Sequence, residues 1–182
     1  SRHFKKPGSK SPVQAPEVRH LKKLVEEEED DSYIWAYRLL FYAGHRISEV
    51  IHMRISWISI EESYVKIRVP PFAAKGSLRD TEPEFTFLPQ LLEEKLKDFI
   101  KQRYGRDSFE ELWEEIQKGE AEDLYLLELG EQGDRDFRYV KRTEEKFNRH
   151  LKKTADDAGI EWAEDFSSHR FRKGFVHRMK SK

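Results

Sequence analysis

The sequence contains no cysteine, and it has no apolar run of the length that a membrane helix needs, about 20 residues. The first absence excludes disulfide bonds and metal sites built from thiolates. The second, together with a polar N-terminal stretch unlike a signal peptide, favours a soluble, cytoplasmic protein. The seven histidines show no H-E-x-x-H or comparable ligand spacing, so we expect neither a metal nor another cofactor.

A large net charge is also missing, because 34 basic and 35 acidic residues leave a formal charge of -1. A uniformly neutral surface would argue against binding to nucleic acid. The charges are segregated, however: residues 1–24 hold seven basic residues against one acidic (+6), residues 106–134 two against eleven (-9), and residues 135–182 fourteen against eight (+6). The acidic stretch therefore conceals two basic regions that could contact phosphates.

The chain has enough apolar and aromatic residues for one core. Its 182 residues are 37% hydrophobic and 13% aromatic, which suits a single globular domain. Residues 1–16 are basic, contain Gly, Ser and Pro, and lack periodicity, so we interpret them as a linker or arm. The folded domain is then expected at residues 17–182.

The most informative stretch begins with a nearly continuous apolar run. Residues 34–43 are predicted to form a buried helix, with Ser32 as its N-cap and Gly44 ending it, because glycine best adopts the left-handed conformation after a helix. A second helix is predicted from Arg46, with Ile47, Val50 and Ile51 facing the core.

Arg46 and Glu49 fall on a different stripe of that second helix, so Arg46 should project away from the core. A cation in the first turn opposes the helix dipole, which favours a role in binding an anion such as a phosphate. The alternative is a structural ion pair between Arg46 and Glu49, one turn away.

A small antiparallel sheet is predicted next. Residues 64–69 alternate in polarity as a half-buried strand does, and residues 72–88 resemble a hairpin with a turn at Gly76-Ser77. Phe85 and Phe87 alternate on the return strand. Lys75 lies at the hairpin tip, where a lysine is usually only a solubilising edge charge.

The rest of the chain is predicted to be mainly helical, apart from a short strand at residues 124–127. Thr143 is the expected N-cap of a helix that ends at Gly159. The overall expectation is an α+β fold that is mainly α. Apolar periodicity and capping signals give the other helices at residues 16–25, 90–104 and 108–119.

The last informative stretch, residues 165–179, is predicted to be a helix capped by Ser167 or Ser168, with Phe171, Phe175 and Met179 buried. His169 and Arg172 are three residues apart and so share a neighbouring face. An imidazole and a guanidinium placed in this way can converge on one phosphate.

These motifs resemble those of tyrosine recombinases, the phage-integrase family. Residues 43–50, Ala-Gly-His-Arg-Ile-Ser-Glu-Val, resemble the first-arginine box, roughly T-G-L-R-x-S-E-L, and His169 with Arg172 resembles the H-x-x-R box. The family carries a catalytic lysine on a β-hairpin between these boxes, and Lys75 is the matching position. The resemblance starts near Pro16, and it departs from the family at Lys173, where a second histidine is usual.

The resemblance implies a catalytic domain with a helical core and a small antiparallel sheet, which cuts and rejoins DNA through a covalent 3′-phosphotyrosyl intermediate. Arg46 and Arg172 would hold the non-bridging oxygens, and His169 would contact the same phosphate and assist proton removal from the tyrosine. Lys75 would protonate the departing 5′-oxygen, with Arg79 or Lys66 as alternatives.

The family's nucleophilic tyrosine lies downstream of H-x-x-R, but this chain has no tyrosine after Tyr139. We do not assign Tyr139 as the nucleophile, and we expect that the chain lacks the C-terminal segment that carries it. That segment is cut off or unresolved, or the tyrosine comes from a neighbouring protomer.

Double-stranded DNA is the expected partner, with self-association into dimers or tetramers on it. Lys152, Lys153 and Lys173 are candidate contacts to the DNA backbone. The high charged fraction, 38%, is typical of thermophile proteins and would suit an archaeal viral or plasmid integrase. The alternatives are a strand transferase like type IB topoisomerases and a DNA-binding or architectural module that keeps the fold without cleaving.

Overall fold

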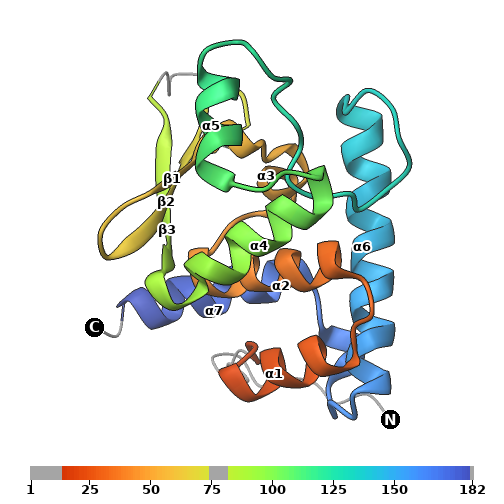
Figure 1. Cartoon of the computed structure of the whole chain (residues 1–182). Coiled ribbons are helices and arrows are strands. Elements are labelled where there is room, and N and C mark those ends of the chain that lie inside the picture. The colour runs from red at the N-terminus through yellow and green to blue at the C-terminus, as the bar shows by residue number, and fades with distance from the viewer. Residues whose placement is uncertain (1–13, 74–81, 181–182) are drawn as a thin grey trace, which may run out of the picture.

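The computed structural model describes residues 14–73 and 82–180. The chain is mainly helical and has one small antiparallel sheet, which confirms the predicted fold class (Figure 1). In chain order its elements are α1 (Val18–Glu27), α2 (Asp31–Ala43), α3 (Ile47–His52), η1 (Ile55–Trp57), β1 (Ile58–Ile60), β2 (Tyr64–Val69), β3 (Glu84–Pro89), η2 (Gln90–Leu92), α4 (Glu93–Tyr104), α5 (Phe109–Gln117), α6 (Phe137–Asp157), η3 (Ala163–Asp165) and α7 (Ser168–Lys180).

Helix α2 forms the centre of the core, because it is apolar on nearly every side and packs against α1, α3, α7 and β3. It ends as predicted at Gly44, which has a left-handed φ of 68°. The predicted N-cap is wrong. Asp30 caps the helix by accepting a hydrogen bond from the backbone N–H of Ser32 at 2.9 Å, and Ser32 itself lies inside the helix.

The sheet has the order β1-β2-β3, and both strand pairs are antiparallel. Strand β2 has the predicted bounds, and its alternating pattern buries Val65, Ile67 and Val69. Strand β1 was not predicted, because three residues are too few to show a periodicity. The strand expected at residues 124–127 is also absent from the described structure, where only an isolated bridge joins Tyr125 to Arg54.

Helix α6 is longer than expected, because it begins at Phe137 and not near Thr143. Asp136 is the N-cap and accepts a hydrogen bond from the backbone N–H of Tyr139 at 2.8 Å. Thr143 is buried in the second turn, against Gly130. A threonine inside the helix was therefore mistaken for its cap.

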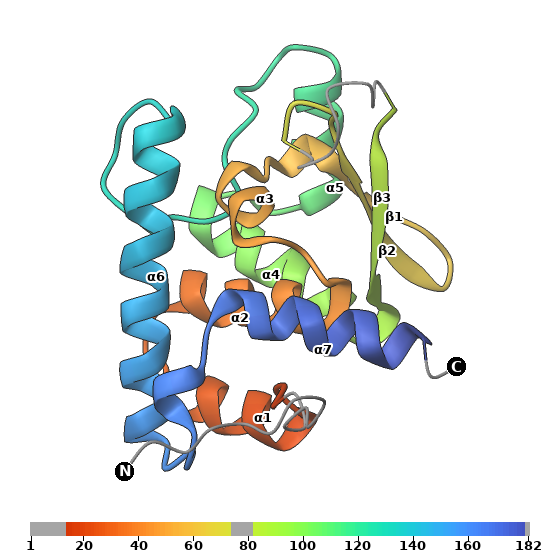
Figure 2. The ribbon, with the colours of Figure 1, turned by 180° about the vertical axis from the view of Figure 1, so that it is seen from behind.

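The sheet and α6 lie on opposite sides of α2 (Figure 1), and α7 runs from one side to the other across the back (Figure 2). Phe171 on α7 is buried as predicted, and Phe175 packs so closely on Gly44 that a Cβ there would lie 2.1 Å from its ring. Met179 was expected to be buried, but it is 55% exposed because it lies in the last turn of α7.

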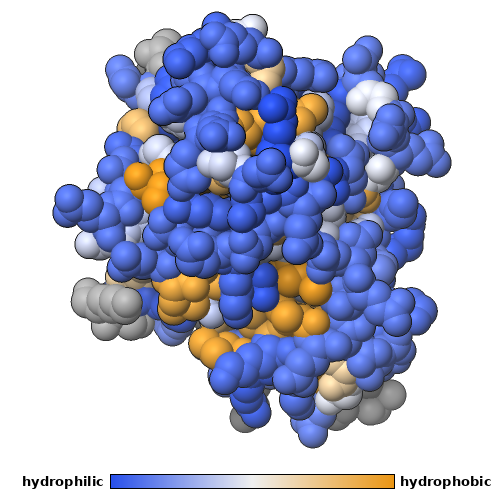
Figure 3. All heavy atoms as spheres, viewed as in Figure 1, coloured by the Kyte–Doolittle hydropathy of each residue, from blue (hydrophilic) through white to orange (hydrophobic). Residues whose placement is uncertain are grey.

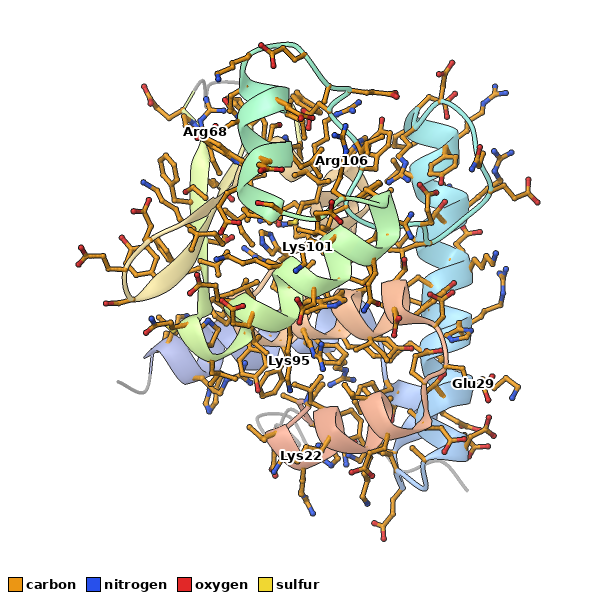
Figure 4. All side chains as sticks on the ribbon, viewed as in Figure 1. Lys22, Glu29, Arg68, Lys95, Lys101 and Arg106 are labelled. Atoms are coloured by element: carbon orange, nitrogen blue, oxygen red, sulfur yellow. The ribbon has the colours of Figure 1, made fainter. Side chains whose placement is uncertain are left out.

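The face seen in Figure 1 is mostly hydrophilic, and hydrophobic residues show mainly in a band between α4 and α1 (Figure 3). Charged side chains lie across this face, from Lys22 on α1 to Lys95 and Lys101 on α4 (Figure 4). The phosphate-binding candidates belong to α3 and α7, and α7 is at the front in the opposite view (Figure 2).

Candidate functional site

Arg46 is held at the start of α3, where the chain turns after Gly44. It is the N-cap residue of α3, and its side chain is 28% exposed. Ile47, Val50 and Ile51 face the core, as predicted. Arg46 therefore stands at the surface on a short, well-anchored helix.

Glu49 was expected on the outer stripe with Arg46, but its side chain is only 2% exposed. Its Oε1 accepts a hydrogen bond from the backbone N–H of Arg46 at 2.8 Å, and its Oε2 lies 3.6 Å from Nη1 of that residue. The ion pair considered from the sequence is thus present. The ion pair engages Nη1 of Arg46, and the rest of the guanidinium remains accessible to solvent.

The pKa of the Glu49 carboxyl lies below its usual value. Burial alone would raise this pKa, but the His45 ring, the backbone N–H of Arg46 and the Arg46 guanidinium together favour the charged form more strongly. Glu49 therefore stays ionised behind Arg46.

Helix α7 supplies the other two candidates. Ser167 is the cap residue, since its Oγ accepts from the backbone N–H of Arg170 at 3.4 Å, and the N–H of Ser168 donates to Oδ1 of Asn148 on α6. Arg172 donates from Nη1 to the carbonyl oxygen of Gly44 at 2.5 Å. His169 is exposed and forms no hydrogen bond or ion pair with the residues that the structure describes.

These side chains meet in one open cleft with a volume of about 860 Å³. Cationic groups dominate it, and Glu144 is the one carboxylate among the described residues that line it. Lys75 lies outside the described residues, but Phe72 and Ala73, which precede it closely, line the cleft. The lining residues are Arg46, Ile47, Ser48, His52, Phe72, Ala73, Arg135, Phe137, Val140, Lys141, Glu144, Ser168, His169 and Arg172.

The three candidate backbone contacts lie elsewhere on the surface. Lys152, Lys153 and Lys173 are all exposed, and none of them lines the cleft. Lys153 is 2.8 Å from Asp157, one helical turn away, so part of its charge is already compensated.

Comparison with known proteins decides what kind of domain this is. Residues 13–182 match the model of the phage integrase family. The chain belongs to this family. Its structure is similar to the crystal structure of XerA recombinase, with a TM-score of 0.59 and 20% sequence identity over 94% of this chain and 52% of that chain. The integrase domain thus spans about half the length of that protein. No curated protein matches it.

Sequence reasoning missed two cations in the cleft of this integrase domain, Arg135 and Lys141. Arg135 directly follows the acidic stretch and has no periodic signal, yet its side chain is only 4% exposed. It donates to the carbonyl oxygens of Ile51 and Leu127 and pairs with Glu128. Arg135 therefore joins the end of α3 to residues 127–128.

His52, which the sequence suggested was structural, also lines the cleft. Burial lowers its pKa, and the positive charges of Arg135 and Arg54 lower the pKa further. The imidazole is thus kept neutral, and its ring meets that of Phe72 edge to face at 6.0 Å.

All seven tyrosines of the sequence lie in the described residues, and none of them lines the cleft. Tyr139 is 6% exposed on α6. Within the same residues, there is no cluster of His, Asp or Glu that could hold a metal ion, and no helix has the length and apolar character to cross a membrane.

Proposed function

We propose that this integrase domain binds the scissile phosphate of duplex DNA in its cleft, as the catalytic part of a site-specific recombinase. One observation carries the proposal. Arg46 and Arg172, far apart in the sequence, line the same cleft, and Arg172 is bonded to Gly44 in the turn that leads to Arg46. Two guanidinium forks at one site suit the two non-bridging oxygens of a phosphodiester.

The reaction is a transesterification. A tyrosine phenolate attacks phosphorus, a 3′-phosphotyrosyl bond forms and the bond to the 5′-oxygen breaks. Arg46 and Arg172 stabilise the extra negative charge of the pentacoordinate state. His169, exposed beside them, contacts the same phosphate and assists proton removal from the tyrosine.

Lys75 remains our candidate for protonating the 5′-oxygen, whose alkoxide is a poor leaving group. Support comes from Phe72 and Ala73, because the described chain leading toward Lys75 borders the cleft. Lys66 is a weaker alternative, since its ammonium lies 4.4 Å from the centre of the exposed Phe85 ring on the sheet surface.

The nucleophilic tyrosine is proposed to come from outside these 182 residues, either from a following segment or from a second protomer. This follows from the composition of the cleft, which no tyrosine of the chain lines. Self-association on DNA, as a dimer or tetramer, would then bring protomers together at paired sites.

Trapping on a nicked suicide substrate tests the proposal. After cleavage such a DNA loses a short fragment, so the covalent complex cannot reseal and survives on a denaturing gel. We expect an adduct from a longer version that carries the family's tyrosine, and none from the 182-residue chain. An adduct formed by the 182-residue chain at Tyr125 or Tyr139 would contradict the assignment.

This assay separates an enzyme from a non-cleaving module, and strand exchange on intact DNA separates a recombinase from a topoisomerase. A non-cleaving binding module would retain DNA without an adduct even when the tyrosine is present. A topoisomerase-like enzyme would cleave and rejoin without needing paired recognition sites, whereas a recombinase would depend on them.

A further inference from the structure

His45 is a buried, titratable residue that the proposed mechanism does not use. It directly precedes Arg46, and its side chain has no exposed surface. The first-arginine pattern has leucine at this position, so packing alone does not require an imidazole here. A buried polar ring needs hydrogen-bonding partners, and these identify its role.

The two ring nitrogens of His45 face different elements. Nε2 lies 2.8 Å from Oγ1 of Thr86 on β3, and Nδ1 lies 3.4 Å from Oε1 of Glu49 on α3. A neutral imidazole donates from one nitrogen and accepts at the other. If the hydroxyl of Thr86 donates to Nε2, then Nδ1 carries the proton and faces the carboxylate.

Apart from the 2.8 Å hydrogen bond that the backbone N–H of Arg46 donates to Oε1 of Glu49, the contacts behind Arg46 are few. Nδ1 of His45, Nη1 of Arg46 and Oε2 of Glu49 are buried and form no hydrogen bond within residues 14–73 and 82–180. They are held at ion-pair distances, 3.4 and 3.6 Å. The other charged group nearby is Arg172, bonded to the carbonyl of Gly44. A small rotation of Glu49 would therefore release the guanidinium of Arg46.

We propose that His45 is a positioning residue: its ring, between Thr86 and Glu49, fixes the carboxylate that holds Arg46 at the cleft. In this way β3 orients the first arginine through a side-chain relay. The relay itself is a property of the fold, whereas its effect on DNA rests on the proposed function.

The relay is tested without DNA by long-range ¹H–¹⁵N NMR of the histidine rings in the 182-residue chain at neutral pH. We expect His45 as the Nδ1–H tautomer. Thr86→Val is nearly isosteric and removes only the hydroxyl, so the domain should fold while the tautomer becomes mixed. An Nε2–H tautomer in the unmodified chain, or one unaffected by Thr86→Val, would overturn the relay.

The effect of the relay on DNA binding is tested by a double-mutant cycle, in which the affinity for a short fluorescein-labelled duplex is measured. Arg46→Ala should weaken DNA affinity about tenfold, and His45→Leu roughly threefold. On the Arg46→Ala background, His45→Leu should have no further effect, because it acts through the arginine. His45→Asn, whose amide N–H can stand near the position of Nδ1–H, should restore most of the affinity.

His20→Leu is the matched control, since His20 is also buried but lies on α1. It should leave the affinity unchanged on both backgrounds. An equal loss from His45→Leu on both backgrounds would make His45 a packing residue and overturn the inference, while the proposed function stands. If Arg46→Ala is silent but the tautomer is as expected, the relay stands and the proposed phosphate site fails.

Discussion

Two of the hollows in the described structure use their arginines in different ways. In the smaller one, of about 420 Å³, Arg54 donates to the carbonyl of Asp123 at 2.6 Å and to the hydroxyl of Tyr125 at 3.0 Å, and it stacks on the Tyr125 ring. In the larger cleft, the Arg172 guanidinium donates one described hydrogen bond, to Gly44, and the Arg46 guanidinium makes only the ion pair with Glu49.

The two hollows also differ in the number of carboxylates that line them. Carboxylates line the smaller one, among them Glu122, Asp123 and Glu128, and they would repel a phosphate. The larger cleft has a single lining carboxylate among the described residues. An arginine whose N–H groups are already occupied stabilises loops, whereas one with unoccupied groups can bind an anion. The comparison therefore favours the larger cleft as the proposed phosphate site.

The largest effect should come from the cleft. In a longer version that carries the nucleophilic tyrosine, Arg46→Ala or Arg172→Ala should slow single-turnover cleavage about 10²–10³-fold. This is the loss typical of removing a donor to a developing oxyanion. Arg54→Ala is the matched control from the smaller hollow and should slow cleavage far less. Similar losses from all three variants would remove the distinction between the two hollows.

Arg135 lies in the wall between the hollows and should matter mainly for stability. Its removal leaves the carbonyls of Ile51 and Leu127 without their buried donor, while Glu128 keeps its pairing with Arg103, so Arg135→Ala should lower the free energy of unfolding by about 3 kcal/mol. Urea denaturation measures this, with the exposed Arg138→Ala as control. A value for Arg135→Ala within error of Arg138→Ala would mean that Arg135 is not an anchor.

Glu49 should make the free energy of unfolding depend on pH in the acidic range. Its pKa is depressed in the folded state, so its stabilising contribution is complete above the ordinary value of 4.5 and is lost as the pH falls through the folded pKa. The stability difference between the unmodified chain and Glu49→Gln should therefore shrink below pH 4.5. Chemical denaturation across pH measures it. Glu94→Gln, at a side chain that is 81% exposed, is the control substitution.

The exposed lysines should have the smallest effect. If Lys152 and Lys173 contact phosphates, replacing both by Ala should reduce the slope of log affinity against log salt by about 2, because each contact releases roughly one counterion. Lys95 and Lys101 on α4, on the face opposite α7, are the matched control pair (Figure 4). An equal change in both pairs would indicate diffuse attraction without a defined contact.

The sequence was sufficient for features that depend on local pattern. Gly44, the inward face of α3, strand β2 and the H-x-x-R spacing all follow from short-range periodicity or capping. Glu49 could not be placed correctly, because its carboxylate faces His45, whose other ring nitrogen meets Thr86 on β3, and the sequence does not show this contact between distant segments. Arg135 was missed for the same reason, since its acceptor Ile51 is far away in the chain.

The boundaries of α6 show a different kind of failure. Thr143 and Asp136 are both good N-cap residues, and propensity does not choose between them. The choice depends on packing, because Gly130 lies against the side chain of Thr143 and buries it. Capping signals therefore identified the helix but not its first two turns.

The most direct test of the central claim is to neutralise the scissile phosphate. A methylphosphonate replaces one non-bridging oxygen by a methyl group, so the transition state carries less negative charge for the guanidinium groups to stabilise. In single-turnover cleavage by the longer version that carries the nucleophilic tyrosine, Arg46→Ala and Arg172→Ala should recover most of their lost rate on this substrate. If both variants remain as slow, relative to the unmodified protein, as they are on ordinary DNA, then the two arginines do not hold the non-bridging oxygens and the cleft is not the phosphate site.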